Sequence, residues 1–241
     1  MFAPMSANAQ ILRKKELLKM LQTRYTFEKV SLEVAGETFV LYLVGDVDAL
    51  LEELLAKGAE HEDVLDERIP YWAELWHSAI AMAELIIADD RFNPQTKVLE
   101  LGCGLGLSGI AAGRKGCEVS LSDYLPEAIQ MAELGWLENL GTPAQTAIID
   151  WRDIDPSLKV DWVLAADVAY EERNFEPLRM ALQSLLKPGV KALLTEPGRA
   201  IAKPFLTSLE KIGFSVLRSS RKVKWKGTEN TIGIYEISKE L

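Results

Sequence analysis

The chain has 241 residues, a formal net charge of −9 at pH 7, 48% hydrophobic residues and 26% charged residues. This length suits one large α/β domain with a short appendage, and the composition is that of a folded rather than a disordered protein. An acidic chain gains little from a phosphate backbone, so we do not expect nucleic acid as a substrate. No apolar stretch could span a membrane and residues 1–10 do not resemble a signal peptide, so we expect a cytoplasmic protein that does not enter a membrane.

The N-terminal part has the pattern of a helix and a hairpin. Apolar residues recur at helical spacing over residues 11–24, and two strand-like runs at residues 27–34 and 38–44 flank a turn. Asp46 has the position of an N-cap for a helix through residue 55, and the acidic run at residues 60–67 is typical of a linker. The predicted domains are a small N-terminal α+β extension over residues 1–66 and a larger domain over residues 67–241.

The larger domain alternates short apolar runs with helix-length amphipathic stretches, which is typical of βαβ units. The candidate strands are residues 97–101, 118–122, 144–149, 162–166, 191–195, 214–218 and 231–237. Only a short loop rich in basic residues separates the last two, so these should form an antiparallel hairpin. The predicted fold is therefore α/β, with a Rossmann-like seven-stranded, mostly parallel sheet and an antiparallel C-terminal hairpin.

Five basic residues crowd this last connection, at Arg218, Arg221, Lys222, Lys224 and Lys226. We interpret them as a solvated loop or strand edge that lysine keeps soluble. Docking of an acidic protein surface is the alternative.

A glycine-rich turn follows the first strand of the larger domain. Gly102, Gly104, Gly106 and Gly109 lie where an apolar strand runs directly into a helix. Glycine allows a ligand to approach bare backbone, and the helix N-terminus offers free N–H groups. Read from Gly104, the turn spells the GxGxxG fingerprint of dinucleotide sites, so the glycines alone do not identify the ligand.

Acidic residues at three successive strand ends favour S-adenosylmethionine as the cofactor. Glu100 ends an otherwise apolar strand, and a buried carboxylate there needs a partner such as a cationic ligand. Asp123 could accept both ribose hydroxyls, in either kind of cofactor site. Asp150 could accept the adenine amino group while Trp151 packs on the base. A nicotinamide-dependent oxidoreductase is the alternative, and a sheet whose strand ends are simply acidic is a third interpretation.

Residues 70–237 resemble the class I methyltransferases, and specifically the protein-lysine methyltransferases often called family 16. Three segments carry the resemblance: the tryptophan-containing PYWAELW at residues 70–76, the DxxY motif of Asp167 to Tyr170, and the EPGR turn that ends at Arg199. Trp72 and Trp76 could equally form an aromatic core face, and the proline-glycine pair could be only a turn. Asp167 and Tyr170 follow a strand directly, at the edge where ligands of open α/β sheets bind.

The resemblance implies a methyltransferase that N-methylates a lysine side chain of a protein. Its implied catalytic residues are Asp167, which would orient the amine, and Tyr170, which would wall the channel. The predicted cofactor-binding residues are Trp72, Glu100, Gly102, Gly104, Gly106, Asp123, Tyr124, Asp150, Trp151 and Ala166. A small-molecule N-methyltransferase and a non-catalytic protein with this fold are the alternatives. Cys103, Cys117, His61 and His77 form no metal-ligand pattern, so no metal is predicted.

Overall fold

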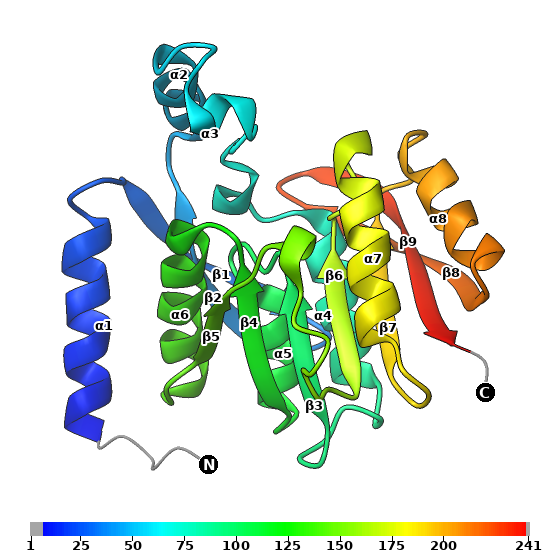
Figure 1. Ribbon diagram of the computed structural model, residues 1–241. Coiled ribbons are helices and arrows are strands. Elements are labelled where there is room, and N and C mark those ends of the chain that lie inside the picture. The colour runs from blue at the N-terminus through cyan, green and yellow to red at the C-terminus, as the bar shows by residue number, and fades with distance from the viewer. Residues whose placement is uncertain (1–6, 240–241) are drawn as a thin grey trace.

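The computed structural model describes residues 7–239, and a seven-stranded sheet forms its centre (Figure 1). The strands lie in the order β5-β4-β3-β6-β7-β9-β8. Their bounds are β3 (Lys97–Leu101), β4 (Glu118–Asp123), β5 (Gln145–Ile148), β6 (Trp162–Ala166), β7 (Lys191–Glu196), β8 (Phe214–Trp225) and β9 (Thr228–Lys239). The first five are parallel, whereas β9 is antiparallel to both β7 and β8. The predicted fold class is confirmed.

Helices cover both faces of this sheet, which explains why its strands are continuous apolar runs. Helices α4 (His77–Ala88), α5 (Leu107–Arg114) and α6 (Pro126–Leu140) lie on one face, and α7 (Phe175–Leu185) and α8 (Ala202–Lys211) on the other (Figure 1). The chain proceeds from β3 outward to β5 and then returns to β6 on the other side of β3. Such a reversal opens a crevice at the carboxyl ends of the strands, where ligands of α/β proteins bind.

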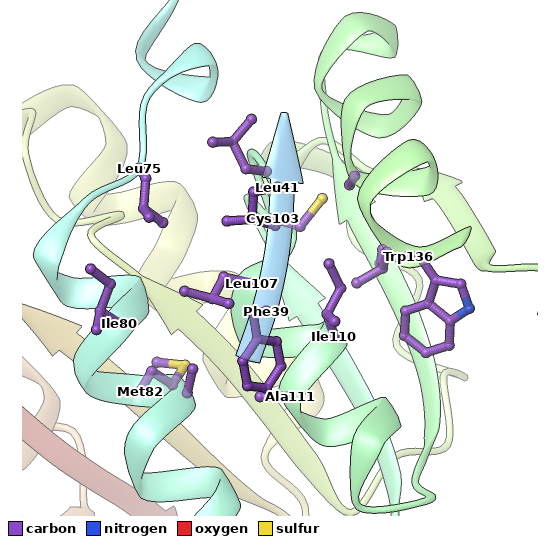
Figure 2. Packing of buried hydrophobic residues seen from close by; sticks show 14 of the residues in the cluster. Phe39, Leu41, Leu75, Ile80, Met82, Cys103, Leu107, Ile110, Ala111 and Trp136 are labelled. Carbon is purple, nitrogen blue, oxygen red and sulfur yellow. The ribbon is translucent and has the colours of Figure 1, made fainter. Parts of the chain in front are cut away.

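The N-terminal elements α1 (Ala7–Leu21), β1 (Phe27–Val34) and β2 (Glu37–Val44) add a further layer outside α5 and α6 (Figure 1). The next two, α2 (Val47–Ala56) and α3 (Glu62–Leu65), lie instead beyond the carboxyl edge of the sheet (Figure 1). Phe39 and Leu41 of β2 are fully buried and belong to one apolar cluster with Ile110 and Trp136 (Figure 2). This face of the core therefore includes side chains from both predicted domains, and the boundary near residue 66 stays a prediction.

The element predictions hold for most of the chain. Asp46 caps α2 as expected, because its Oδ1 accepts a hydrogen bond from Ala49 N at 2.9 Å. The first helix begins before the expected residue 11 and ends at Leu21. The proposed linker over residues 60–67 was wrong in part, since residues 62–65 form α3 with His61 as its N-cap.

The loop predicted between the last two strands was also wrong, because strand β8 continues to Trp225 and only residues 226–227 connect it to β9. Four of the five basic residues lie on this strand at the edge of the sheet, which confirms the strand-edge interpretation, and Lys226 lies in the turn. Acids pair with three of them: Arg218 binds Glu210 at 2.8 Å, Arg221 binds Glu84 at 3.1 Å and Lys222 binds Glu229 at 3.1 Å. Val223 is buried between Lys222 and Lys224. The many charged residues of this segment therefore masked the alternation that is typical of a half-buried strand.

Within residues 7–239, no helix combines the length and the apolar content that crossing a bilayer requires.

Candidate active site

The glycine turn between β3 and α5 is a stretch of bare backbone at the carboxyl edge of the sheet. Gly102 has φ +63°, a left-handed conformation that other residues adopt at a cost. A Cβ atom at Gly102 would lie 3.1 Å from Cζ2 of Trp151 and 3.3 Å from Cγ1 of Val168. Gly104 and Gly106 share the positive φ. The turn therefore strongly favours glycine at these positions, and it leaves backbone groups free to face a ligand.

Two buried carboxylates hold this turn in place. Glu100 is 2% exposed, and its Oε2 accepts a hydrogen bond from Gly109 N at 2.9 Å, in the first turn of α5. Asp123 accepts from Gly104 N at 3.0 Å through Oδ2 and from Leu125 N at 3.1 Å through Oδ1. Burial raises the pKa of Glu100 to about 8 and also raises the pKa of Asp123. Both carboxyls would gain from a cationic or hydrogen-bond-donating ligand, which would favour their ionised forms.

The end of the third strand is arranged differently from expectation. Asp150 caps the short 3-10 helix η2 (Trp151–Asp153), and both its oxygens accept from Arg152 Nε, at 2.8 and 2.9 Å. This arginine lowers the pKa of the Asp150 carboxyl. The ring of Trp151 lies directly over Gly102. A ligand that binds Asp150 must therefore share it with Arg152.

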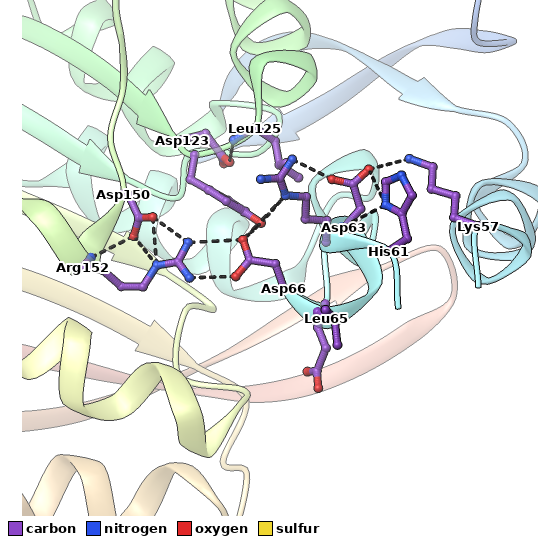
Figure 3. A network of polar contacts seen from close by, with 12 residues as sticks. Lys57, His61, Asp63, Leu65, Asp66, Asp123, Leu125, Asp150 and Arg152 are labelled. Atoms are coloured by element: carbon purple, nitrogen blue, oxygen red, sulfur yellow. Dashed lines mark hydrogen bonds and ion pairs between the residues drawn. The ribbon is translucent and has the colours of Figure 1, made fainter. Parts of the chain in front are cut away.

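A polar network joins this edge to the N-terminal segment (Figure 3). Arg152 also binds Asp66, with Nη1 2.7 Å from Oδ1, and the Tyr124 hydroxyl donates to Asp66 at 3.1 Å. Arg68 Nε donates to that same hydroxyl at 2.9 Å. The segment around α3 thereby closes one side of the site. Neither Asp66 nor Arg152 was predicted at the site, because the sequence around an acid in an expected linker does not indicate which arginine it will bind.

These residues line one pocket with a volume of about 330 Å³, which we call the glycine pocket. All twelve residues predicted for the site contribute to its wall: Trp72, Glu100, Gly102, Gly104, Gly106, Asp123, Tyr124, Asp150, Trp151, Ala166, Asp167 and Tyr170. The structure thus brings together residues that the sequence spreads over about a hundred positions. A pocket of this size suits a small organic ligand.

A second cavity of about 270 Å³ adjoins the glycine pocket and shares part of its wall. It is lined by Tyr71, Trp76, Asp167, Tyr170, Glu171 and Arg199, and we call it the aromatic cavity. The ring of Tyr71 meets Tyr170 edge-on at 5.1 Å and Trp76 at 6.0 Å between centroids. Tyr71 is 38% exposed, so the cavity reaches the surface. Burial raises the pKa of Tyr170 well above its usual range, which keeps this hydroxyl protonated.

Asp167 lies where the two cavities meet, and two side chains hold it. Asp167 directly follows β6, and its φ of +59° is unusual for a residue other than glycine. Ser78 Oγ, from the first turn of α4, donates to Oδ2 of Asp167 at 2.8 Å. The Arg199 guanidinium binds Oδ1. Ser78 is fully buried and was missed, because a serine in an apolar helix has no chemical pattern of its own.

The turn after β7 holds Arg199 against Asp167. Oε2 of the buried Glu196 accepts from Gly198 N at 2.7 Å and from Arg199 N at 2.8 Å. Its Oε1 accepts from the Tyr235 hydroxyl at 2.9 Å. Gly198 has φ +83°, which the tight turn requires. The EPGR segment is therefore more than a solvated turn, since its acid organises the backbone that carries the arginine.

Comparison with known proteins identifies the class. The sequence profile of the lysine methyltransferase family matches residues 66–212, more than half of the chain. The chain belongs to this family. Among curated relatives, a histone-arginine methyltransferase of Xenopus laevis is 25% identical over 56% of this chain and 63% of its own length. The electron transfer flavoprotein beta subunit lysine methyltransferase of Danio rerio is 33% identical over 54% of this chain and 51% of its own length. The chain thus spans about half to two thirds of these relatives.

Among solved structures, the fold is similar to that of the magnesium protoporphyrin IX methyltransferase of Synechocystis PCC 6803, which was determined with bound S-adenosylmethionine. The matched region covers 80% of this chain and 92% of that chain. The TM-score is 0.52 at 16% sequence identity, so this likeness concerns the fold. Family membership confirms the predicted methyltransferase class over the oxidoreductase alternative, and with it S-adenosylmethionine as the cofactor.

Both histidines of the chain lie outside these two cavities. His61 Nδ1 accepts from Asp63 N at 3.1 Å and so caps α3, and His77 Nε2 lies 3.2 Å from Thr228 Oγ1. Between residues 7 and 239, no group of three or more His, Cys, Asp or Glu side chains has a metal-binding arrangement.

Proposed function

We propose that this protein transfers a methyl group from S-adenosylmethionine to the ε-amine of a lysine in a protein substrate. The observation that carries the proposal is the aromatic cavity, which joins the glycine pocket at Asp167 and Tyr170 and reaches the surface beside Tyr71. A narrow aromatic cavity with an open end suits one long side chain presented by a protein. The family and the lysine methyltransferase of Danio rerio support the same acceptor.

The residues of the glycine pocket suit the cofactor. The glycines of the turn would allow its amino acid portion to approach the backbone, with Glu100 facing its positive charge. Asp123 would accept the ribose hydroxyls, and Trp151 would pack on adenine beside Asp150. Trp72, Tyr124 and Ala166 complete the wall. The raised pKa values of the two buried acids support a cationic ligand, because a positive charge nearby would offset the cost of burying them ionised.

The protein's contribution to the reaction is alignment and removal of the proton from the acceptor. A lysine amine has a pKa of about 10.4 in water, and an aromatic, poorly hydrated cavity lowers it by disfavouring the charged form. Asp167 would orient the amine, and Tyr170 with Tyr71 would hold its alkyl chain. When bound, the cofactor would supply a methyl group on a positively charged sulfur. The amine oriented by Asp167 would accept this methyl group, with the C–S electron pair left on sulfur, and would lose one proton to solvent.

We further propose that the protein works in the cytoplasm and that its substrate is not a nucleic acid. The net charge of −9 supports the second point, because contact with a phosphate backbone depends on excess positive charge.

The proposed function is tested by incubating the protein with a cell lysate and S-adenosylmethionine labelled on the methyl group. Labelled macromolecules are then separated from labelled metabolites, and labelled proteins are digested to locate the modified residue. We expect label on lysine of one or a few proteins and far slower labelling with the Asp167→Asn variant. Label in the metabolite fraction alone would support a small-molecule N-methyltransferase instead. Absence of any label, together with no cofactor binding in calorimetry, would indicate a non-catalytic protein with this fold.

A further inference from the structure

Both carboxylates of the aromatic cavity are already paired with cations of the chain itself. Asp167 holds the Arg199 guanidinium, and Glu171 Oε2 accepts from Arg173 Nε at 2.9 Å and from Asn174 Nδ2 at 3.2 Å. The remaining titratable groups of the wall are the hydroxyls of Tyr71 and Tyr170. An incoming acceptor therefore meets no carboxylate of the cavity wall that lacks a partner.

The pair between Arg199 and Asp167 is well sheltered for an arginine near a cavity mouth. The Asp167 side chain is 7% exposed and that of Arg199 is 29% exposed. Glu196 and Gly198 fix the backbone behind the arginine, and Ser78 fixes the other oxygen of the aspartate. A pair that is held from both sides and largely removed from water keeps its geometry and resists screening by salt.

We infer that Arg199 determines the acceptor specificity: by neutralising Asp167, it makes the aromatic cavity accept an uncharged amine and refuse a guanidinium. This inference rests on the proposed function. It matters because lysine and arginine methyltransferases both occur among the relatives of this chain. Arg199 acts here through Asp167 and is a positioning residue.

The two acceptors differ in whether they can lose their charge. A lysine amine, with a pKa of about 10.4, enters as the neutral base at a modest cost, whereas a guanidinium keeps its proton in proteins. An arginine acceptor would place a second guanidinium beside Arg199, with a single carboxylate between them. Loss of water disfavours either cation and the faces of the aromatic rings attract either cation, so neither effect distinguishes the two, and the charge of Arg199 makes the difference.

The test uses two analogues of S-adenosylhomocysteine that extend from the sulfur position into the aromatic cavity, one with a propylamine arm and one with a propylguanidine arm. Calorimetry measures their affinities between pH 7 and pH 9 for the unaltered protein and for Arg199→Gln, Arg199→Lys and Arg218→Gln. Arg218 is the matched control, because it is also an arginine paired with an acid but lies on β8, away from both cavities. S-adenosylhomocysteine itself reports on the glycine pocket.

For the unaltered protein, we expect the affinity for the amine analogue to rise about tenfold for each pH unit, because one proton is lost on binding below the pKa of the amine. The guanidine analogue should bind about tenfold more weakly than the amine at pH 9, with no pH dependence. In Arg199→Gln the freed Asp167 should hold the protonated amine, so the pH slope should flatten and the guanidine analogue should gain about tenfold. Arg199→Lys should retain the slope, and Arg218→Gln should behave as the unaltered protein.

Equal affinities and equal pH slopes in the unaltered protein and in Arg199→Gln, with unchanged binding of S-adenosylhomocysteine, would overturn the inference. Loss of the pH dependence in Arg199→Lys would also overturn the inference. The packing of the arginine side chain, rather than its positive charge, would then be responsible for the specificity. If no protein form bound S-adenosylhomocysteine, the proposed function would fail instead. The two failures are therefore distinguishable.

Discussion

The glycine pocket and the aromatic cavity meet at Asp167, but the two acids beside the glycine turn are held differently from the acids of the aromatic cavity. In the glycine pocket, Glu100 and Asp123 accept hydrogen bonds from backbone N–H groups, which carry no net charge, and burial raises the pKa of both. In the aromatic cavity, Asp167 and Glu171 are paired with arginines of the chain.

Because of this difference, the glycine pocket and the aromatic cavity favour ligands of different charge. Backbone N–H groups orient a carboxylate without cancelling its charge, so the glycine pocket still favours a cation. An arginine cancels it, so the aromatic cavity favours a neutral group. A methyltransferase that binds a sulfonium cofactor and attacks it with an uncharged amine needs both preferences a few ångströms apart.

The largest effect on turnover is expected for Asp167, where the two cavities meet. Asp167→Asn should lower turnover about a hundredfold, because the amine loses its orienting group, while affinity for S-adenosylhomocysteine should change less than about twofold. Asp161→Asn is the matched control: Asp161 lies at the opposite end of the same strand, where its Oδ2 accepts from Lys97 N at 2.8 Å. Full turnover in the Asp167 variant, measured with methyl-labelled cofactor, would remove this aspartate from the mechanism.

The glycine pocket is tested by Gly102→Ala, which should weaken cofactor binding about tenfold through backbone strain and contact with Trp151. Gly141→Ala separates these causes, because Gly141 has nearly the same φ, +62°, at the end of α6 but no atom within 4 Å of its Cβ position. We expect Gly141→Ala to lower the melting temperature without altering affinity in calorimetry. Equal affinities for both variants would mean that Gly102 does not shape the pocket.

The raised pKa of Glu100 predicts a pH dependence of stability in the ligand-free protein. A carboxyl whose pKa rises from 4.5 to about 8 on folding contributes stability that is present below pH 4.5 and is lost as the pH rises through 8. The raised pKa of Asp123 acts in the same direction. Between pH 5 and pH 8, the melting temperature should therefore fall about 10 °C further in the unaltered protein than in Glu100→Gln. If the melting temperatures of the two proteins changed in parallel with pH, the ionised Glu100 carboxylate would not destabilise the fold.

The smallest effect is expected on the basic strand β8, which lies outside both compartments. Since acids already pair with Arg218, Arg221 and Lys222, Lys222→Glu combined with Lys224→Glu should change the KM for the acceptor protein less than about twofold. A KM that rises severalfold at low salt and recovers at high salt would instead support docking of an acidic partner on this strand.

The sequence by itself determined most of the glycine pocket of this protein. Strand ends and the glycine turn are local features: an apolar run, an acid at its end and a glycine that tolerates positive φ are written within a few residues of one another. Parallel strands then place their carboxyl ends at a common edge whatever the details of packing, so Glu100, Asp123 and Asp150 had to converge. The same logic placed Asp167 and Tyr170 there.

Only the tertiary structure decided what each charge pairs with. Ser78, Asp66 and Arg152 gave no signal in the sequence, because a hydrogen bond across about ninety positions depends on how helices and segments pack on the sheet. The sequence left the basic residues of β8 open between a loop and a strand edge, because their acidic partners lie on α4, α8 and β9. For the same reason the sequence could propose Asp167 as the orienting group but could not reveal that Arg199 occupies it. The charge that an acceptor meets in the cavity follows from that pairing.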